Sequence, residues 1–285
     1  MQAIKIPSNF NYIAVFLTMD CNYKCSYCIN QHHAKLKRGK QLSGSDWVRG
    51  LNRIKTASNL PITFQGGEPT LHKDFFEITN CVKAYMNKDL LTNLSCDVDS
   101  FIANVPSAVY KREAPYASIR VSYHHGQSIY QDLIHSVYKM MTAGYDIGVW
   151  EVDHPRDHDG VAQRMHVAKR MGIDWRTKEF LGMYEGKLYG TMRYDQAVGS
   201  PLKRDCECKT SELIIAPDGH LHRCHSDLYQ GISPIGHLLD EKVSGLSDWR
   251  HCKNYGDCNA CDIKVTTNRF QEYGHSSVEV KNVKR

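Results

Sequence analysis

The stretch YIAVFLTMDCNYKCSYC, residues 12–28, decides the fold of this chain. Residues 12–18 form an apolar, β-branched run that is typical of a buried strand. Residues 21–28 then place three cysteines in the pattern C-x3-C-x2-C directly after it. In folds built from parallel strands, sites form in the loops that follow the strands. A loop with three thiolates can hold three corners of an iron–sulfur cubane and leave one iron open.

Outward from this stretch, short apolar runs alternate with helical patterns as far as residue 182. The expected strands are 12–18, 61–65, 89–93, 118–123, 146–152 and 173–180, and the expected helices are 45–57, 73–86, 97–104, 128–142 and 160–171. Strands that alternate with helices predict parallel pairing through right-handed crossovers. The sequence therefore predicts an α/β fold, either an open doubly wound sheet or a partial barrel.

Capping residues and turn residues mark the ends of these elements. Ser43, Asp74 and Asp159 are expected N-caps, because a short oxygen side chain accepts hydrogen bonds from free helix N–H groups. Gly144 and Gly172 stand where helices should end. Further on, the pair 218–219 is Asp-Gly between two apolar runs, which predicts a hairpin.

Length, charge and cysteine usage narrow the class of protein. The chain has 285 residues, a formal net charge of +5 and 11 cysteines. Its apolar runs are far shorter than the roughly 20 residues that cross a bilayer, and its first residues do not resemble a secretion signal. An odd, clumped set of cysteines argues against a disulfide framework and for metal ligation. We therefore expect a cytoplasmic protein without a membrane segment.

The cysteine loop, with Tyr27 before its last member, resembles the signature of the radical SAM superfamily. The motif Gly66-Gly67-Glu68-Pro69 follows the second strand and resembles the superfamily's G-G-E-P motif, which binds the amino end of S-adenosylmethionine. Glycines let backbone carbonyls approach an ammonium group closely. The resemblance implies a partial (β/α)6 barrel, a bound S-adenosylmethionine and a 4Fe–4S cluster. Its ligands would be Cys21, Cys25 and Cys28; on local grounds a zinc site completed by His32 or His33 is the alternative.

Softer matches extend the cofactor site. Asn93 belongs to a segment that resembles the superfamily's T-N-G element, with Leu94 in place of glycine, and Ser122 matches a strand residue that reaches the ribose. Arg176 would bind the cofactor's carboxylate, unless it forms an ordinary salt bridge. His124 and His125 replace the superfamily's usual residues, and act on the substrate or serve the structure.

Six further cysteines occupy the C-terminal part and resemble the opening of SPASM or twitch domains, which carry auxiliary clusters. This resemblance implies a second 4Fe–4S site held by Cys208, Cys224, Cys258 and Cys261, with Cys206 and Cys252 as alternates. A structural zinc site is the alternative. The expected domains are a core at 1–182, a connector at 183–205, an auxiliary domain at 206–270 and a loose tail at 271–285.

The resemblance also implies the chemistry. Reductive cleavage of S-adenosylmethionine would give a 5′-deoxyadenosyl radical that abstracts hydrogen from a substrate, with flavodoxin or ferredoxin as electron donor. A peptide, cross-linked or epimerised, is the favoured substrate; a nucleoside, a nucleic acid, a sugar alcohol or another small molecule is the alternative. Cys96 is a candidate hydrogen donor or else a small buried hydrophobe, and Cys81 is expected in the core. The non-enzymatic alternative is a zinc-stabilised binding protein.

Overall fold

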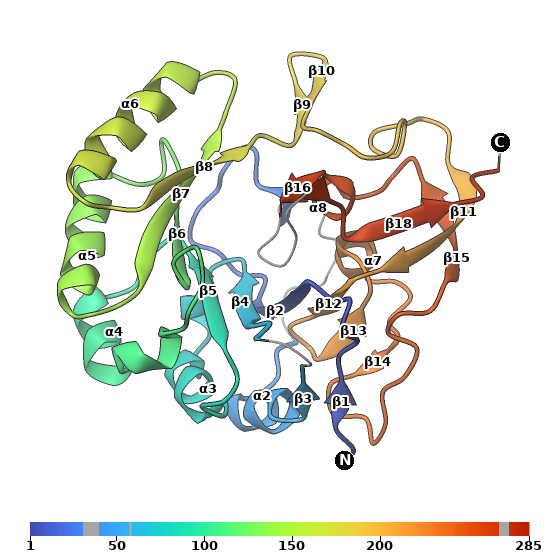
Figure 1. Ribbon diagram of the computed structural model, residues 1–285, viewed down its shortest axis with the longest axis horizontal. Coiled ribbons are helices and arrows are strands. Elements are labelled where there is room, and N and C mark those ends of the chain that lie inside the picture. Colours follow the sequence, from blue (N-terminus) through green and yellow to red (C-terminus); the bar gives the residue numbers. More distant parts are fainter. Residues whose placement is uncertain (31–39, 57–58, 268–273, 285) are drawn as a thin grey trace.

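A curved sheet with helices on its outer face forms the main body of the protein (Figure 1). The computed structural model describes residues 1–30, 40–56, 59–267 and 274–284. Within them the sheet has nine strands in the order β14-β13-β12-β2-β4-β5-β6-β7-β8. The run from β2 to β8 is parallel throughout and comprises β2 (Tyr12–Thr18), β4 (Ile62–Gly66), β5 (Lys88–Thr92), β6 (Ile119–Tyr123), β7 (Ile147–Asp153) and β8 (Trp175–Glu179). The predicted partial barrel of six parallel strands is confirmed.

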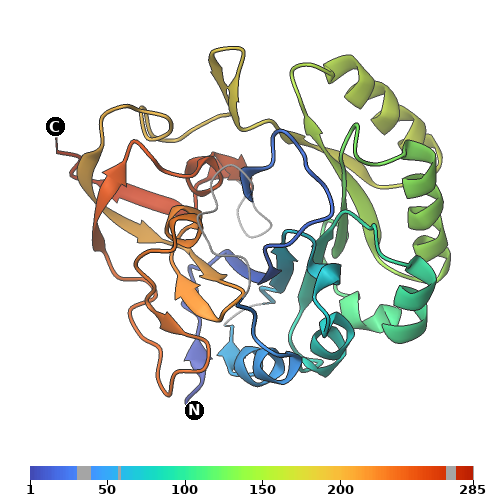
Figure 2. The same ribbon diagram turned by 180° about the vertical axis from the view of Figure 1, so that it is seen from behind.

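The helices cover one face of this sheet, and the C-terminal part of the chain lies toward the other face (Figure 2). They are α2 (Gly44–Leu51), α3 (Phe75–Cys81), α4 (Val98–Asn104), α5 (Tyr130–Thr142) and α6 (His158–Arg170), with short 3-10 turns η1 (Pro69–Leu71) and η2 (Ser107–Tyr110). Strand alternation divides the two faces. Ile13 and Val15 of β2 belong to the core under the helices, whereas Phe16 packs on the opposite side with Ile214 and Tyr229.

Several predicted boundaries differ from the structure. The helix expected at 45–57 ends at Leu51, because the buried Ile54 joins a short strand, β3 (Ile54–Lys55), that pairs with β1 (Ile4–Lys5). Residues 57–58 lie outside the described residues. The Ser43 cap is confirmed, since its side chain accepts from Asp46 N.

The other predicted caps have mixed outcomes. Asp74 is the N-cap of α3 by position, but its carboxylate accepts from Gly44 N at 2.8 Å instead of from its own helix. Asp157 stands at the N-cap of α6, which puts Asp159 in the first turn. The predicted glycine ends are confirmed: Gly144 has a φ of 86° and Gly172 one of 79°.

The C-terminal part first extends the main sheet. The predicted hairpin is confirmed as β12 (Glu212–Ile215) and β13 (His220–His222), followed by β14 (Gly236–His237). β12 pairs in parallel with β2, so the sheet runs across the domain limits that we expected. Those limits stay a prediction. The expected connector contains a small hairpin of β9 (Gly182–Tyr184) and β10 (Lys187–Tyr189).

A second, three-stranded sheet faces the open side of the first (Figure 1). Its order is β15 (Arg250–Tyr255), β11 (Arg204–Thr210) and β18 (Val278–Lys281), all antiparallel. The helices α7 (His225–Gln230) and α8 (Ala260–Ile263) accompany it, and β16 (Thr266–Thr267) pairs with β17 (Gly274–His275). Residues 278–281 are therefore an ordered strand and not the loose tail that we expected.

The hydrophobic segments of the fold are short. Among the described residues, no helix has both the length and the apolar character needed to cross a membrane.

Candidate active site and metal centres

The three-cysteine loop follows β2 at the carboxyl edge of the parallel sheet. Cys28 N donates to Cys25 O at 3.0 Å, so the chain turns tightly between these two cysteines. Burial, and then the neighbouring thiols of Cys28 and Cys21, raise the pKa of Cys25 to about 12. Thiols that raise one another's pKa lie close together, and a bound cation reverses the effect because it favours thiolates. His32 and His33, the alternative ligands, lie outside the described residues.

The glycine turn after β4 lies directly against the strand that leads into this loop. Gly67 N donates to Thr18 O and Glu68 N donates to Asp20 O, both at 2.8 Å. A Cβ on Gly66 would lie 2.1 Å from Thr18 O, and Gly66 has a φ of 140°. Both glycines are therefore required by close backbone approach. Two motifs that are distant in the sequence form one structural unit here.

Glu68 fastens this turn to the end of β5. Its buried carboxylate accepts from Asn93 N and from Thr92 Oγ1, both at 2.7 Å. Burial raises the pKa of Glu68, and these hydrogen bonds act against that rise. Leu94, which stands where the superfamily has glycine, adopts the left-handed φ of 54° that glycine favours.

Asn93 and His124 contact residues of the cysteine loop. Asn93 Nδ2 lies 3.0 Å from Asn22 Oδ1 and 4.0 Å from Cys21 Sγ. Tyr27 Oη lies 3.1 Å from His124 Nδ1, just past β6. Burial, and then the charge of Lys178, lower the pKa of His124 to about 4, so its imidazole is neutral at pH 7. Ser122 is two residues earlier and shares that face of the strand.

His125, by contrast, is exposed. Its Nδ1 lies 3.9 Å from Asp157 Oδ2, at the start of α6. These contacts support a surface role for His125.

Arg176 forms the ordinary salt bridge. Its Nε donates to Asp174 Oδ1 at 2.9 Å, and its Nη2 donates to Pro115 O at 2.8 Å. The strand begins at Trp175, so Arg176 lies at its amino end, away from the edge that carries the cysteine loop. Its contacts therefore give no support to a role at the cofactor's carboxylate.

Lys178 is a residue that the sequence analysis missed. It lies on the same strand face as Arg176 but nearer the carboxyl edge. Solvent reaches its side chain, yet the surrounding protein desolvates the ammonium group, and Arg120 and Lys264 repel it. These effects lower the pKa of Lys178 to about 7. The sequence did offer a signal, because Lys178 lies nearer than Arg176 to the carboxyl end of the expected strand 173–180, where sites form in parallel sheets.

Cys96 and Cys81 differ from each other in burial. Cys96 packs against the core between sheet and helices, and burial, together with the charge of Glu68, raises its pKa to about 12. This placement favours the interpretation of Cys96 as a small hydrophobe. Cys81 is exposed at the end of α3, so the prediction of a core cysteine is wrong.

The pairing of β11 with β15 brings three cysteines of the second group together. Cys206 stands opposite Cys252, and Cys208 stands opposite Arg250. Directly opposed residues, and residues two apart on one strand, share a face of the sheet. Three thiols and one guanidinium therefore form a square on one face of the small sheet.

Loops close the pocket above this square. Cys224 is the N-cap of α7, where Asp227 N lies 3.5 Å from its Sγ, and Cys258 precedes α8. The pocket is lined by five cysteines, Cys206, Cys208, Cys224, Cys252 and Cys258. Hydrogen bonds from Cys206 and Cys208 hold the pKa of Cys252 far below its usual range, which shows that these thiols touch.

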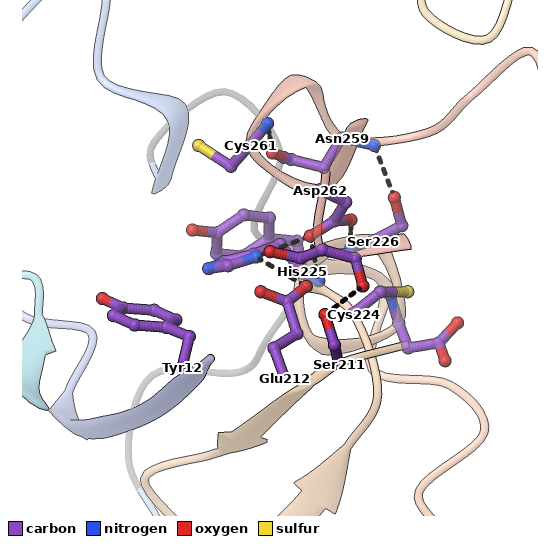
Figure 3. Close-up of polar contacts among 12 residues, drawn as sticks. Tyr12, Ser211, Glu212, Cys224, His225, Ser226, Asn259, Cys261 and Asp262 are labelled. Carbon is purple, nitrogen blue, oxygen red and sulfur yellow. Dashed lines mark hydrogen bonds and ion pairs between the residues drawn. The ribbon is translucent and has the colours of Figure 1, made fainter. Parts of the chain in front are cut away.

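Cys261 is not among the residues that line this pocket. Figure 3 shows its Sγ and the Sγ of Cys224 pointing in opposite directions from a layer formed by His225 and Asp262. Of the four expected ligands, the structure thus brings Cys208, Cys224 and Cys258 together and leaves Cys261 apart. Both alternates, Cys206 and Cys252, lie in the pocket.

The layer between Cys224 and Cys261 is a buried polar triad of Glu212, His225 and Asp262 (Figure 3). His225 Nδ1 lies 2.6 Å from Asp262 Oδ1, and the same oxygen accepts from His225 N at 3.0 Å. Burial and the charge of Asp262 hold the pKa of Glu212 well above its usual range, whereas contact with His225 lowers the pKa of Asp262. The triad thereby ties α8 to the amino end of α7 and orients both cysteine-bearing segments.

Comparison with known proteins agrees with this arrangement. Residues 15–103 match the family model described as Radical SAM superfamily. This part of the chain is therefore similar to the radical SAM superfamily. The cofactors of this superfamily are a 4Fe–4S cluster and S-adenosylmethionine, and the three thiols beside a glycine turn fit both groups.

The chain spans less than half of the length of the curated relatives compared with it here. The chain is 32% identical over 76 residues to GTP 3′,8-cyclase of Actinobacillus succinogenes, which covers 26% of this chain and 23% of that protein. It is 27% identical over 154 residues to PqqA peptide cyclase of Rhodopseudomonas palustris, which covers 53% and 39% respectively. The solved structure of anSMEcpe with bound AdoMet shares the fold, with a TM-score of 0.55 and 14% identity over 83% of this chain and 78% of that one.

Proposed function

We propose that this protein is a radical SAM enzyme in which Cys21, Cys25 and Cys28 hold the catalytic 4Fe–4S cluster. The carrying observation is the pair of 2.8 Å hydrogen bonds from Gly67 N and Glu68 N to the chain just before Cys21, which sets the glycine turn beside the cysteine loop. When bound, the cluster and S-adenosylmethionine together supply a 5′-deoxyadenosyl radical that takes a hydrogen atom from the substrate.

The residues around the loop hold and shield these groups. Glu68 fixes the turn through Thr92 and Asn93, so the carbonyl groups of Gly66 and Gly67 can receive the cofactor's ammonium group. Neutral His124 orients Tyr27, which belongs to the loop, through the contact between its Nδ1 and Tyr27 Oη. Ser122, on the same strand face, is in our proposal the residue that binds the ribose.

A second cluster belongs in the five-cysteine pocket. A cubane in which no iron is left open takes four thiolates, and Cys206, Cys208, Cys224, Cys252 and Cys258 supply that number with one to spare. The competing proposal is a structural zinc ion, which also takes four cysteines. Iron and sulfide analysis separates the two, since zinc gives a colourless pocket without sulfide.

We favour a peptide as the substrate. The match to PqqA peptide cyclase covers 53% of this chain, a larger share than the 26% matched by GTP 3′,8-cyclase. The latter relative supports a nucleotide as the second candidate. A small one-electron carrier such as flavodoxin or ferredoxin would supply the electron.

One anaerobic experiment tests the enzyme class. The protein is purified without oxygen, its iron and sulfide are measured, and dithionite and S-adenosylmethionine are added. We expect about eight irons per chain for two cubanes and the release of 5′-deoxyadenosine. The Cys21→Ala variant should lose this release, whereas Cys261→Ala should keep its iron. An iron-loaded protein that leaves the cofactor intact would contradict the proposal and favour a binding protein.

A panel of candidate substrates tests the second part. Peptides and nucleoside triphosphates are each added to the active protein, and 5′-deoxyadenosine release is compared with the release without substrate. Stimulation by nucleotides alone would overturn the preference for a peptide.

A further inference from the structure

Arg250 occupies the fourth corner of the square that carries three of the pocket's cysteines. The register places it opposite Cys208 and two residues from Cys252 on the same strand face. Val278 and Val280 of β18 continue that face and also line the pocket. A cation in this otherwise thiol-rich and apolar surface requires an anion to offset the cost of its desolvation.

The acceptors around Arg250 are a thiol group and one carboxylate. Its Nη2 lies 2.5 Å from Asp227 Oδ2 and 3.5 Å from Cys224 Sγ. The side chain is 15% exposed and that of Asp227 is 2% exposed. Its Nε is buried and finds no acceptor within the described parts of the chain. The guanidinium therefore has a free donor inside the pocket as well as a contact to a sulfur atom.

An iron–sulfur cubane is a fitting acceptor for these donors. With four thiolates it carries a net negative charge, and one-electron reduction adds a further negative charge. Hydrogen bonds to cluster sulfurs and a nearby cation stabilise the reduced form more than the oxidised form. A guanidinium has five N–H groups, so Arg250 keeps further hydrogen-bond donors besides the one that contacts Asp227.

We propose that Arg250 donates to sulfur atoms of the auxiliary cluster and raises its reduction potential, with Asp227 holding the guanidinium in place. This inference rests on the proposed function, because it requires a cluster in the pocket. Arg250 is a positioning and tuning residue and touches no substrate. A cluster of raised potential, held by the pocket's cysteines and Arg250, would accept one electron from a substrate radical that releases one proton to a base.

The test uses the full chain with Cys21→Ala, Cys25→Ala and Cys28→Ala, so that only the auxiliary cluster is measured. Into this background we introduce Arg250→Gln, Arg250→Lys or the control Lys281→Gln. Lys281 pairs with Glu207 on the opposite face of the same sheet, so its variant removes an equal charge without touching the pocket. Each protein is reconstituted, its iron is counted, and its midpoint potential is measured by anaerobic titration.

We expect Arg250→Gln to shift the potential to more negative values, Arg250→Lys to shift it less, and Lys281→Gln to leave it unchanged. The lysine variant keeps the buried charge next to Asp227, so it remains measurable if the glutamine variant does not hold its cluster. A full iron content with unchanged potentials in the Arg250 variants would overturn the proposed role of Arg250 but not the presence of the auxiliary cluster. A background protein without iron would overturn both this inference and the auxiliary cluster.

Discussion

Cys206 and Cys252 stand directly opposite each other in the antiparallel register of β11 and β15. This pairing places both thiols in the second cysteine pocket, while Cys261 points away from it. Three of the five cysteines that line the pocket therefore come from the small sheet. The spacing of Cys258 and Cys261 in the sequence does not by itself predict which cysteines line it.

The double variant Cys206→Ala/Cys252→Ala separates the two ligand sets. It leaves Cys208, Cys224, Cys258 and Cys261 intact, which is the set expected from the sequence. Because the structure places three of those four in the pocket, we expect iron to fall from about eight to about four per chain. Iron analysis after anaerobic reconstitution checks this, with Cys261→Ala as the comparison that keeps about eight. The reverse pattern would restore Cys261 as a ligand.

Gly66→Ala should abolish the release of 5′-deoxyadenosine. The added Cβ would lie 2.1 Å from Thr18 O, so the glycine turn must move away from the cysteine loop. Gly182→Ala is the matched control, since Gly182 has a φ of 137°, similar to the 140° of Gly66, with nothing within 4 Å of its Cβ. We expect at least about a tenfold loss in the first variant, equal to about 1.4 kcal/mol, and near-normal release in the second. Equal effects would attribute the loss to backbone strain.

The amine of Lys178 should react with acetylating reagents faster than an ordinary lysine near neutral pH, because its neighbours lower its pKa. With a pKa of about 7, the Lys178 amine is uncharged in about half of the protein molecules at pH 7, whereas the amine of an ordinary lysine is almost fully protonated. Competitive acetylation followed by mass spectrometry should show Lys178 labelled faster than the exposed Lys187. In Lys264→Gln the repulsion from Lys264 is removed while that from Arg120 remains, so the pKa of Lys178 rises in part and labelling at pH 7 slows. Labelling of Lys178 that matches Lys187 in the unchanged protein would contradict this environment.

Asp262→Asn should destabilise the fold. The buried carboxylate holds His225 at 2.6 Å and caps the amino end of α7, so its loss leaves buried donors without an ionised acceptor. Breaking a buried pair costs about 3–5 kcal/mol. Urea unfolding of the metal-free full chain measures the change in the free energy of unfolding. The control Asp153→Asn, which breaks a pair with the exposed His158 at 2.7 Å, should cost no more than about 1 kcal/mol.

The sequence by itself determined the parallel strands and the first cofactor site. Strand β2 was predicted residue for residue, because an apolar run buried on both faces has an unambiguous pattern. The cysteine loop and the glycine turn each lie at the end of such a strand. Parallel strands bring their carboxyl ends to one edge, so the two motifs could be placed together without coordinates.

Only the tertiary structure decided which groups fill the second site. Arg250 enters the pocket because antiparallel register sets it opposite Cys208, and register between strands 40 residues apart is not written in local spacing. Cys261 leaves the pocket because Ile263 packs into the small apolar core and Asp262 binds His225, which fixes the rotation of the one-turn helix α8. Likewise, the true start of β8 decides that Lys178, and not Arg176, lies toward the site edge. Local pattern thus specifies the elements, while pairing and packing choose the faces that they present.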